Sequence, residues 1–139
     1  MKISRNLNDD IAHAPEWFHE AINYNPEEKI LNDKKGDISY SFWKSKSDTT
    51  NLIILIHGTG AHKRWWFPIA PRLNSNAHVI SIDLPGMGDS DFRESYKVED
   101  FGDCVTSVIR HEKLINNISF TYLVGHSLGG HVAGFVATE

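Results

Sequence analysis

One stretch near the C-terminal end restricts the fold of this chain more than any other. Residues 119–124 are mostly β-branched or aromatic and contain neither proline nor glycine, which is typical of a buried strand. They run directly into Gly125-His-Ser-Leu-Gly129, a G-x-S-x-G pattern, and then into small and apolar residues up to Ala137. The order predicts a strand, a sharp turn that carries Ser127, and a tightly packed helix.

The two outer glycines of this pattern have a physical explanation. A serine that projects from a strand-to-helix turn needs a strained backbone, and side chains two residues before and after it would collide. We therefore expect Gly125 and Gly129 to set the geometry of the turn around Ser127. The helix would point its N-terminal amides toward the serine, where negative charge develops during acyl transfer. The pattern also arises by chance, but its strand and helix context favours a nucleophile.

The segments upstream predict an α/β fold. Apolar strands and amphipathic helices alternate from residue 52 onward, which indicates a mostly parallel sheet flanked by helices and joined by right-handed crossovers. A β-hairpin around Gly36 precedes them. We expect residues 1–27 to form a polar segment and a short helix, and residues 28–139 to form part of one domain. The predicted elements are a helix from Pro15, hairpin strands 29–32 and 37–43, strands 52–56 and 78–82, and a helix over 98–114.

Composition narrows the function classes. The chain has 139 residues with 40% hydrophobic and 23% charged residues, as in ordinary soluble domains, and its net charge of −4 argues against a nucleic-acid partner. The longest aliphatic run, Leu52–Ile56, is too short for a membrane span, and the N-terminus lacks the apolar region of a signal peptide. The single cysteine, Cys104, is expected in the core, and a cytoplasmic location is the default. No pattern for a nucleotide cofactor or a metal site is present, so we expect no cofactor.

Four landmarks in a fixed order resemble the N-terminal half of the α/β-hydrolase-fold superfamily, in its esterase- and lipase-like branch with a serine nucleophile. They are the hairpin, His57-Gly-Thr-Gly60 after one strand, residues 83–90 (Asp-Leu-Pro-Gly-Met-Gly-Asp-Ser) after the next, and Gly125–Gly129. Together they cover residues 28–139. The resemblance implies a fold and assigns roles to several of these residues, in addition to what the residues indicate by themselves.

By this resemblance, Ser127 is the catalytic nucleophile, and the backbone amides of Thr59 and Leu128 form the oxyanion hole. His57 and Gly58 shape the loop that carries Thr59, and His57 braces that loop more often than it transfers protons. The resemblance does not settle the roles of two glycines and two tryptophans. Gly86 and Gly88 are expected to have positive φ in their turn, and Trp65 and Trp66 belong either to the core or to a pocket wall.

The chain departs from the family pattern after the serine. Family enzymes place an acid and then a histidine downstream of the nucleophile, but only twelve residues follow Ser127 here. His126 and His131 lie too close to the serine along the chain to act as its base. We therefore expect an incomplete chain that lacks its triad partners, is inactive by itself, and leaves the strand at 119–124 as an open sheet edge.

The leading functional hypothesis is a serine hydrolase that cleaves an ester, thioester or amide of a small-molecule acyl substrate through an acyl-enzyme on Ser127. A serine at this position argues against the dehalogenases and epoxide hydrolases of the family, which use aspartate. It leaves a carbon–carbon bond hydrolase or a cofactor-free haloperoxidase open. A non-catalytic binding or scaffold protein on the same fold is the alternative from another class.

Overall fold

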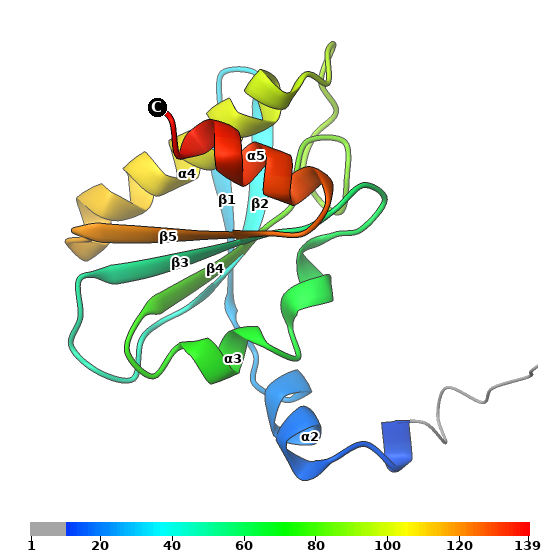
Figure 1. Cartoon of the computed structure of the whole chain (residues 1–139), viewed down its shortest axis with the longest axis vertical. Coiled ribbons are helices and arrows are strands. Elements are labelled where there is room, and N and C mark those ends of the chain that lie inside the picture. The colour runs from blue at the N-terminus through cyan, green and yellow to red at the C-terminus, as the bar shows by residue number, and fades with distance from the viewer. Residues whose placement is uncertain (1–10) are drawn as a thin grey trace, which may run out of the picture.

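A computed structural model describes residues 11–139. Within them, five strands form one sheet in the order β1-β2-β4-β3-β5 (Figure 1). β1 and β2 form an antiparallel hairpin, β2 pairs antiparallel with β4, and β3 lies between β4 and β5 in parallel register. The elements are α2 (Glu16–Ile22), β1 (Glu27–Asp33), β2 (Gly36–Trp43), β3 (Asn51–Ile56), the 3-10 helix η1 (Lys63–Trp66), α3 (Ala70–Leu73), β4 (His78–Ile82), α4 (Val98–Asn116), β5 (Phe120–Gly125) and α5 (Leu128–Val136).

The layers follow from which strands are apolar on both sides. All five residues of β4 are buried, as are four of the six residues of β3. α4 and α5 cover one face of the sheet, and α3 with η1 lies on the other (Figure 1). A strand that is covered on both faces reads as a continuous apolar run, as β3 does over Leu52–Ile56, whereas β4 also buries the polar His78 and Ser81. The α/β fold predicted from the sequence, with its leading hairpin, is confirmed.

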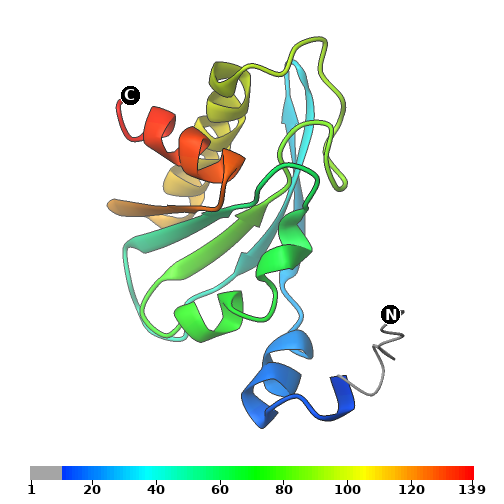
Figure 2. The ribbon, with the colours of Figure 1, turned by 45° about the vertical axis from the view of Figure 1, so that its right-hand side comes forward.

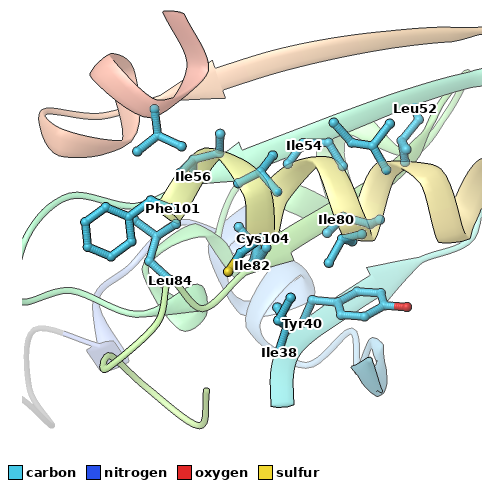
Figure 3. Close-up of a cluster of buried hydrophobic side chains, with 14 of the residues drawn as sticks. Ile38, Tyr40, Leu52, Ile54, Ile56, Ile80, Ile82, Leu84, Phe101 and Cys104 are labelled. Atoms are coloured by element: carbon cyan, nitrogen blue, oxygen red, sulfur yellow. The ribbon is translucent and has the colours of Figure 1, made fainter. Parts of the chain in front are cut away.

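The larger core lies between the sheet and α4 (Figure 3). Ile54, Ile80 and Ile82 from the sheet pack there against Phe101 and Cys104. The predicted apolar face of α4 and the predicted burial of its thiol are both confirmed, and burial raises the pKa of Cys104. A smaller cluster on the opposite face of the sheet is made of Trp43, Leu55, Ala70 and Val79.

The N-terminal helix α2 lies against α3, beyond the end of the sheet (Figure 2). Ala21 is its buried residue, and the guanidinium of Arg72 lies over the ring of Trp17 at 5.1 Å from the ring centroid. The helix predicted from Pro15 is therefore present. Of the predicted N-terminal polar segment, residues 1–10 lie outside the described residues. Between residues 11 and 139, no helix is both long and apolar enough to cross a bilayer.

A buried carboxylate joins α4 to the hairpin. Glu112 is fully buried, and its Oε1 accepts hydrogen bonds from the hydroxyl of Tyr40 at 2.6 Å and from Nζ of Lys29 at 3.1 Å. Asn116 donates to the other carboxylate oxygen. Burial, followed by the hydrogen bond to Glu112, raises the pKa of Tyr40, so this hydroxyl stays protonated. Glu112 is thus held by one cation and two neutral donors.

Lys29→Met should destabilise the protein because it leaves the buried Glu112 without its cation. The substitution keeps a long apolar stem, so the main change is the lost charge. We expect the free energy of unfolding at neutral pH to fall by about 2–4 kcal/mol, as measured by urea denaturation. Lys34→Met, at an exposed position in the hairpin turn, is the control and should change it by less than about 0.5 kcal/mol. Equal stability of the two variants would contradict the role of the Lys29–Glu112 pair.

The two edges of the sheet differ in chemistry. β1 carries the charged residues Glu27, Glu28, Lys29 and Asp33, which is how natural edge strands discourage further pairing. β5 has no charged residue, and among residues 11–139 it pairs only with β3. Its outward side chains on one face are Phe120, Tyr122 and Val124, with 62%, 54% and 41% of their surface exposed. The open edge expected at residues 119–124 is therefore present.

Amide exchange along β5 should alternate. The amides of Phe120 and His126 donate to carbonyls at the two ends of β3, so the amides of Tyr122 and Val124 point the same way. Those of Thr121 and Leu123 then point to the open edge. In this 139-residue chain we expect Thr121 and Leu123 to exchange at least about tenfold faster than Tyr122 and Val124 in NMR-detected hydrogen exchange. Uniform protection would mean that another strand covers the edge.

Candidate active site

Ser127 lies at the turn between β5 and α5 in an unusual backbone conformation. Its φ is 54° and its ψ is −118°, and within residues 11–139 only one other non-glycine residue, Asn117, has a positive φ. Asn117 ends α4 in the left-handed conformation that asparagine tolerates well. A serine in its conformation stores strain that the surrounding structure must hold in place. Ser127 is exposed, so its hydroxyl is accessible to an incoming substrate.

The flanking glycines allow the turn to pack against β3. A Cβ on Gly125 would clash with the carbonyl of Gly129, and a Cβ on Gly129 would clash with the carbonyl of Ile56. The amide of His126 donates to that same Ile56 carbonyl at 3.1 Å. α5 therefore begins in direct contact with the end of β3, and this contact fixes the position of Ser127.

The loop that follows β3 lies beside this turn. A Cβ placed on Gly58 would be 3.2 Å from Cβ of Ser127 and 3.0 Å from Nδ1 of His126. Both segments leave the sheet at the same end (Figure 1), as the carboxyl ends of parallel strands do. The structure thus brings His57–Gly60 and the G-x-S-x-G turn together.

The two amides expected to form an oxyanion hole have no internal partner. Within the described part of the chain, neither Thr59 nor Leu128 donates a backbone hydrogen bond. Leu128 is the first residue of α5, where an amide has no acceptor in its own helix. Thr59 is exposed and follows Gly58, which contacts the serine turn. In residues 11–139 both amides therefore lack an internal acceptor, one directly after Ser127 and one directly after Gly58.

His57 braces the loop through both ring nitrogens. The amide of Leu84 donates to Nε2 at 3.1 Å, so the proton is assigned to Nδ1, which donates to the Gly58 carbonyl at 2.8 Å. The side chain is fully buried, and burial lowers the pKa of His57. The imidazole is neutral and is fully engaged in holding the loop.

The two tryptophans left open by the sequence have different positions. Trp66 packs into the smaller apolar cluster, whereas Trp65 is 58% exposed and stacks on His126 with ring centroids 5.9 Å apart. Trp65 is therefore beside the serine turn and not in the core. His131 is exposed on the first turn of α5.

A proton acceptor for the serine is not part of this arrangement. In residues 11–139, no side chain or backbone group forms a hydrogen bond with the Ser127 hydroxyl. The same residues contain no group of three or more His, Cys, Asp or Glu side chains that could hold a metal ion. The site as described consists of the exposed Ser127 and the two unpaired amides of Thr59 and Leu128.

The sequence pattern does not single out Lys63, which is buried at the end of the loop that carries Thr59. Its ammonium lies 3.1 Å from a carboxylate oxygen of Asp83, in the next loop. Gly86 and Gly88 in that loop have φ of 74° and 57°, so their predicted positive φ is confirmed. Two aspartates, at positions 83 and 89, flank this glycine pair. They are the one sequence signal for a positively charged side chain in contact with the loop.

Known proteins are similar to this chain over about two thirds of its length. Over 96 residues the chain is 35% identical to pimeloyl-[acyl-carrier protein] methyl ester esterase of Neisseria meningitidis, covering 69% of this chain and 34% of that protein. Over 100 residues it is 31% identical to monoacylglycerol lipase abhd6-A of Xenopus laevis, covering 69% of this chain and 28% of that protein. The chain thus spans about a third of the length of these curated relatives.

Solved structures show the same fold. The thioesterase domain from the curacin biosynthetic pathway superposes with a TM-score of 0.70 and 27% identity, over 83% of this chain and 40% of that domain. A membrane phospholipase A described as a bacterial virulence factor superposes with a TM-score of 0.68 and 27% identity, over 96% of this chain and 40% of that protein. The family model of the alpha/beta hydrolase family matches residues 53–138. The chain therefore belongs to the alpha/beta hydrolase family.

Proposed function

We propose that this chain carries the nucleophile and the oxyanion hole of a serine hydrolase that cleaves an ester, thioester or amide of a small-molecule acyl substrate. The observation that carries the proposal is the exposed Ser127, held at a positive φ beside two amides without internal partners, those of Thr59 and Leu128. A strained serine next to free backbone donors is the geometry that acyl transfer requires.

In the proposed reaction, the Ser127 oxygen attacks the substrate carbonyl and its proton passes to a general base. The carbonyl oxygen becomes an anion that accepts hydrogen bonds from the Thr59 and Leu128 amides. Collapse of this intermediate expels the alcohol, thiol or amine, which takes the proton, and leaves an acyl-enzyme. Water then attacks the acyl group and releases the acid. The base and the acid that orients it are left unassigned, because no group in residues 11–139 forms a hydrogen bond with the Ser127 hydroxyl.

The names of the relatives support ester or thioester chemistry. Two curated relatives are named as a methyl ester esterase and a monoacylglycerol lipase, and one solved neighbour is a thioesterase domain. A binding or scaffold role would not need the strained Ser127 or the unpaired amides, so the enzyme proposal accounts for more of the geometry.

Ser127→Ala in the full-length protein should abolish turnover, because no other group takes the place of the attacking oxygen. We expect kcat on a p-nitrophenyl ester to fall by more than about 10³-fold with the melting temperature nearly unchanged. A fluorophosphonate probe should label the wild type at Ser127 and leave the variant unlabelled. Ser119→Ala, an exposed serine just before β5, is the matched control and should keep full activity. Retention of most of the rate by Ser127→Ala would exclude Ser127 as the nucleophile.

The 139-residue chain alone should show no hydrolysis that depends on Ser127. Without a general base the hydroxyl stays protonated, and the oxyanion hole has no alkoxide attack to assist. We expect the chain and its Ser127→Ala variant to hydrolyse p-nitrophenyl acetate at the same rate. A large difference between the two rates would mean that residues 1–139 contain a working base.

A further inference from the structure

Lys63 is a buried cation surrounded by acceptors. Its side chain is 3% exposed, and its Nζ lies 2.7 Å from a carboxylate oxygen of Asp89, 3.1 Å from one of Asp83 and 2.7 Å from Oγ of Ser39. Glu28 lies 3.5 Å away. Burial alone would lower the pKa of Lys63, but the hydrogen bonds to Asp89 and Asp83 outweigh this and raise it. Lys63 is therefore an ammonium at neutral pH.

The backbone of Lys63 is fixed to the same region. Its amide donates to the second carboxylate oxygen of Asp83 at 2.6 Å, and its carbonyl accepts a hydrogen bond from Oγ of Ser81 at 2.7 Å. Asp83 thus binds both the amide and the ammonium of one residue. Because Ser81 and Asp83 lie at the end of β4, Lys63 is attached to the sheet by its backbone and by its side chain.

The loop between β3 and η1 is held at two points. His57 anchors its start through the Leu84 amide, and Lys63 anchors its end. Between these anchors, the backbone hydrogen bond within the loop runs from the Ala61 amide to the Gly58 carbonyl at 3.2 Å. Thr59 is exposed in this span. The position of the Thr59 amide therefore depends on where the two anchors hold the loop.

We propose that Lys63 is a positioning residue for the oxyanion hole: its buried ammonium, held by Asp83 and Asp89, fixes the end of the loop that presents the Thr59 amide. The inference rests on the proposed role of Ser127. A donor that is displaced by about 1 Å loses much of its value in the transition state, where the oxyanion is formed. Loss of Lys63 should therefore lower kcat and leave KM nearly unchanged.

The test compares two lysines that each pair with a buried carboxylate. In the full-length protein, Lys63→Met should lower kcat on p-nitrophenyl butyrate by roughly 10- to 100-fold with KM within about twofold. Lys29→Met breaks the pair with Glu112 at the opposite edge of the sheet from β5. It should lower stability but keep wild-type kcat, measured at a temperature where both variants are folded. Lys63→Arg keeps the positive charge and should recover most of the lost rate.

If Lys63→Met does not fold, a milder variant tests the positioning role of Lys63. The Asp89 side chain is 63% exposed, so Asp89→Asn removes one partner of the ammonium without leaving a buried charge. We expect it to fold and to lower kcat by roughly three- to tenfold. Wild-type kcat in a folded Lys63→Met or in Asp89→Asn would overturn the inference.

A readout without turnover separates this inference from the proposed function. The amide of Ala61, which donates to the Gly58 carbonyl in the wild type, should exchange faster in Asp89→Asn and in Lys63→Met, and at the wild-type rate in Lys29→Met. If exchange rises but the wild type is not labelled at Ser127 by fluorophosphonate, the proposed function fails while the anchoring stands. If Ser127 is labelled and neither exchange nor kcat changes, the anchoring role of Lys63 is wrong.

Discussion

The contact between the start of α5 and the end of β3 is the constraint on which the rest of the site depends. Gly129 packs directly on the Ile56 carbonyl, at a spacing that no side chain would allow. The chain must therefore reverse between Gly125 and Gly129, and Ser127 takes the positive φ. The same contact brings the serine turn beside Gly58, so this turn and the loop after β3 lie at the same end of the sheet. Ser127 and the loop that carries Thr59 lie side by side because two parallel strands are adjacent.

The sequence predicts most of this fold because its signals are local. The unbroken apolar run of β3 and the mostly apolar β4 identify strands that are covered on both faces, and the glycine of the hairpin marks its turn. The periodicity of Val98–Asn116 identifies the face that packs on the larger core. The signal for the serine turn is equally local, since its strand, glycines and helix are contiguous in the sequence. Each of these features depends on backbone geometry and burial within one segment.

What the sequence does not predict depends on contacts between segments. Trp65 and Trp66 are adjacent and chemically identical, but one stacks on His126 and the other packs under the sheet. The rotation of a single 3-10 turn decides which of the two tryptophans faces the serine turn. Lys63 gives no sequence signal of its own, because its partners Asp83 and Asp89 lie 20 and 26 positions away. Local patterns single out Ser127 and miss Lys63, which binds the end of the neighbouring loop to Asp83.

The chemistry of the two loop anchors explains why a charged residue occupies one of them. His57 is neutral and accepts one backbone amide, which suits a position in contact with the core. Lys63 contacts two carboxylates on the loop after β4 and a serine on the hairpin, so a single ammonium joins segments that, within residues 11–139, share no backbone-to-backbone hydrogen bond with η1. A buried ion pair of this kind contributes little net stability compared with apolar side chains of the same volume. Its advantage is that several acceptors at fixed positions restrict the ammonium, and with it the loop, to one position. If the Thr59 amide belongs to an oxyanion hole, as proposed, that restriction serves the site more than additional burial would.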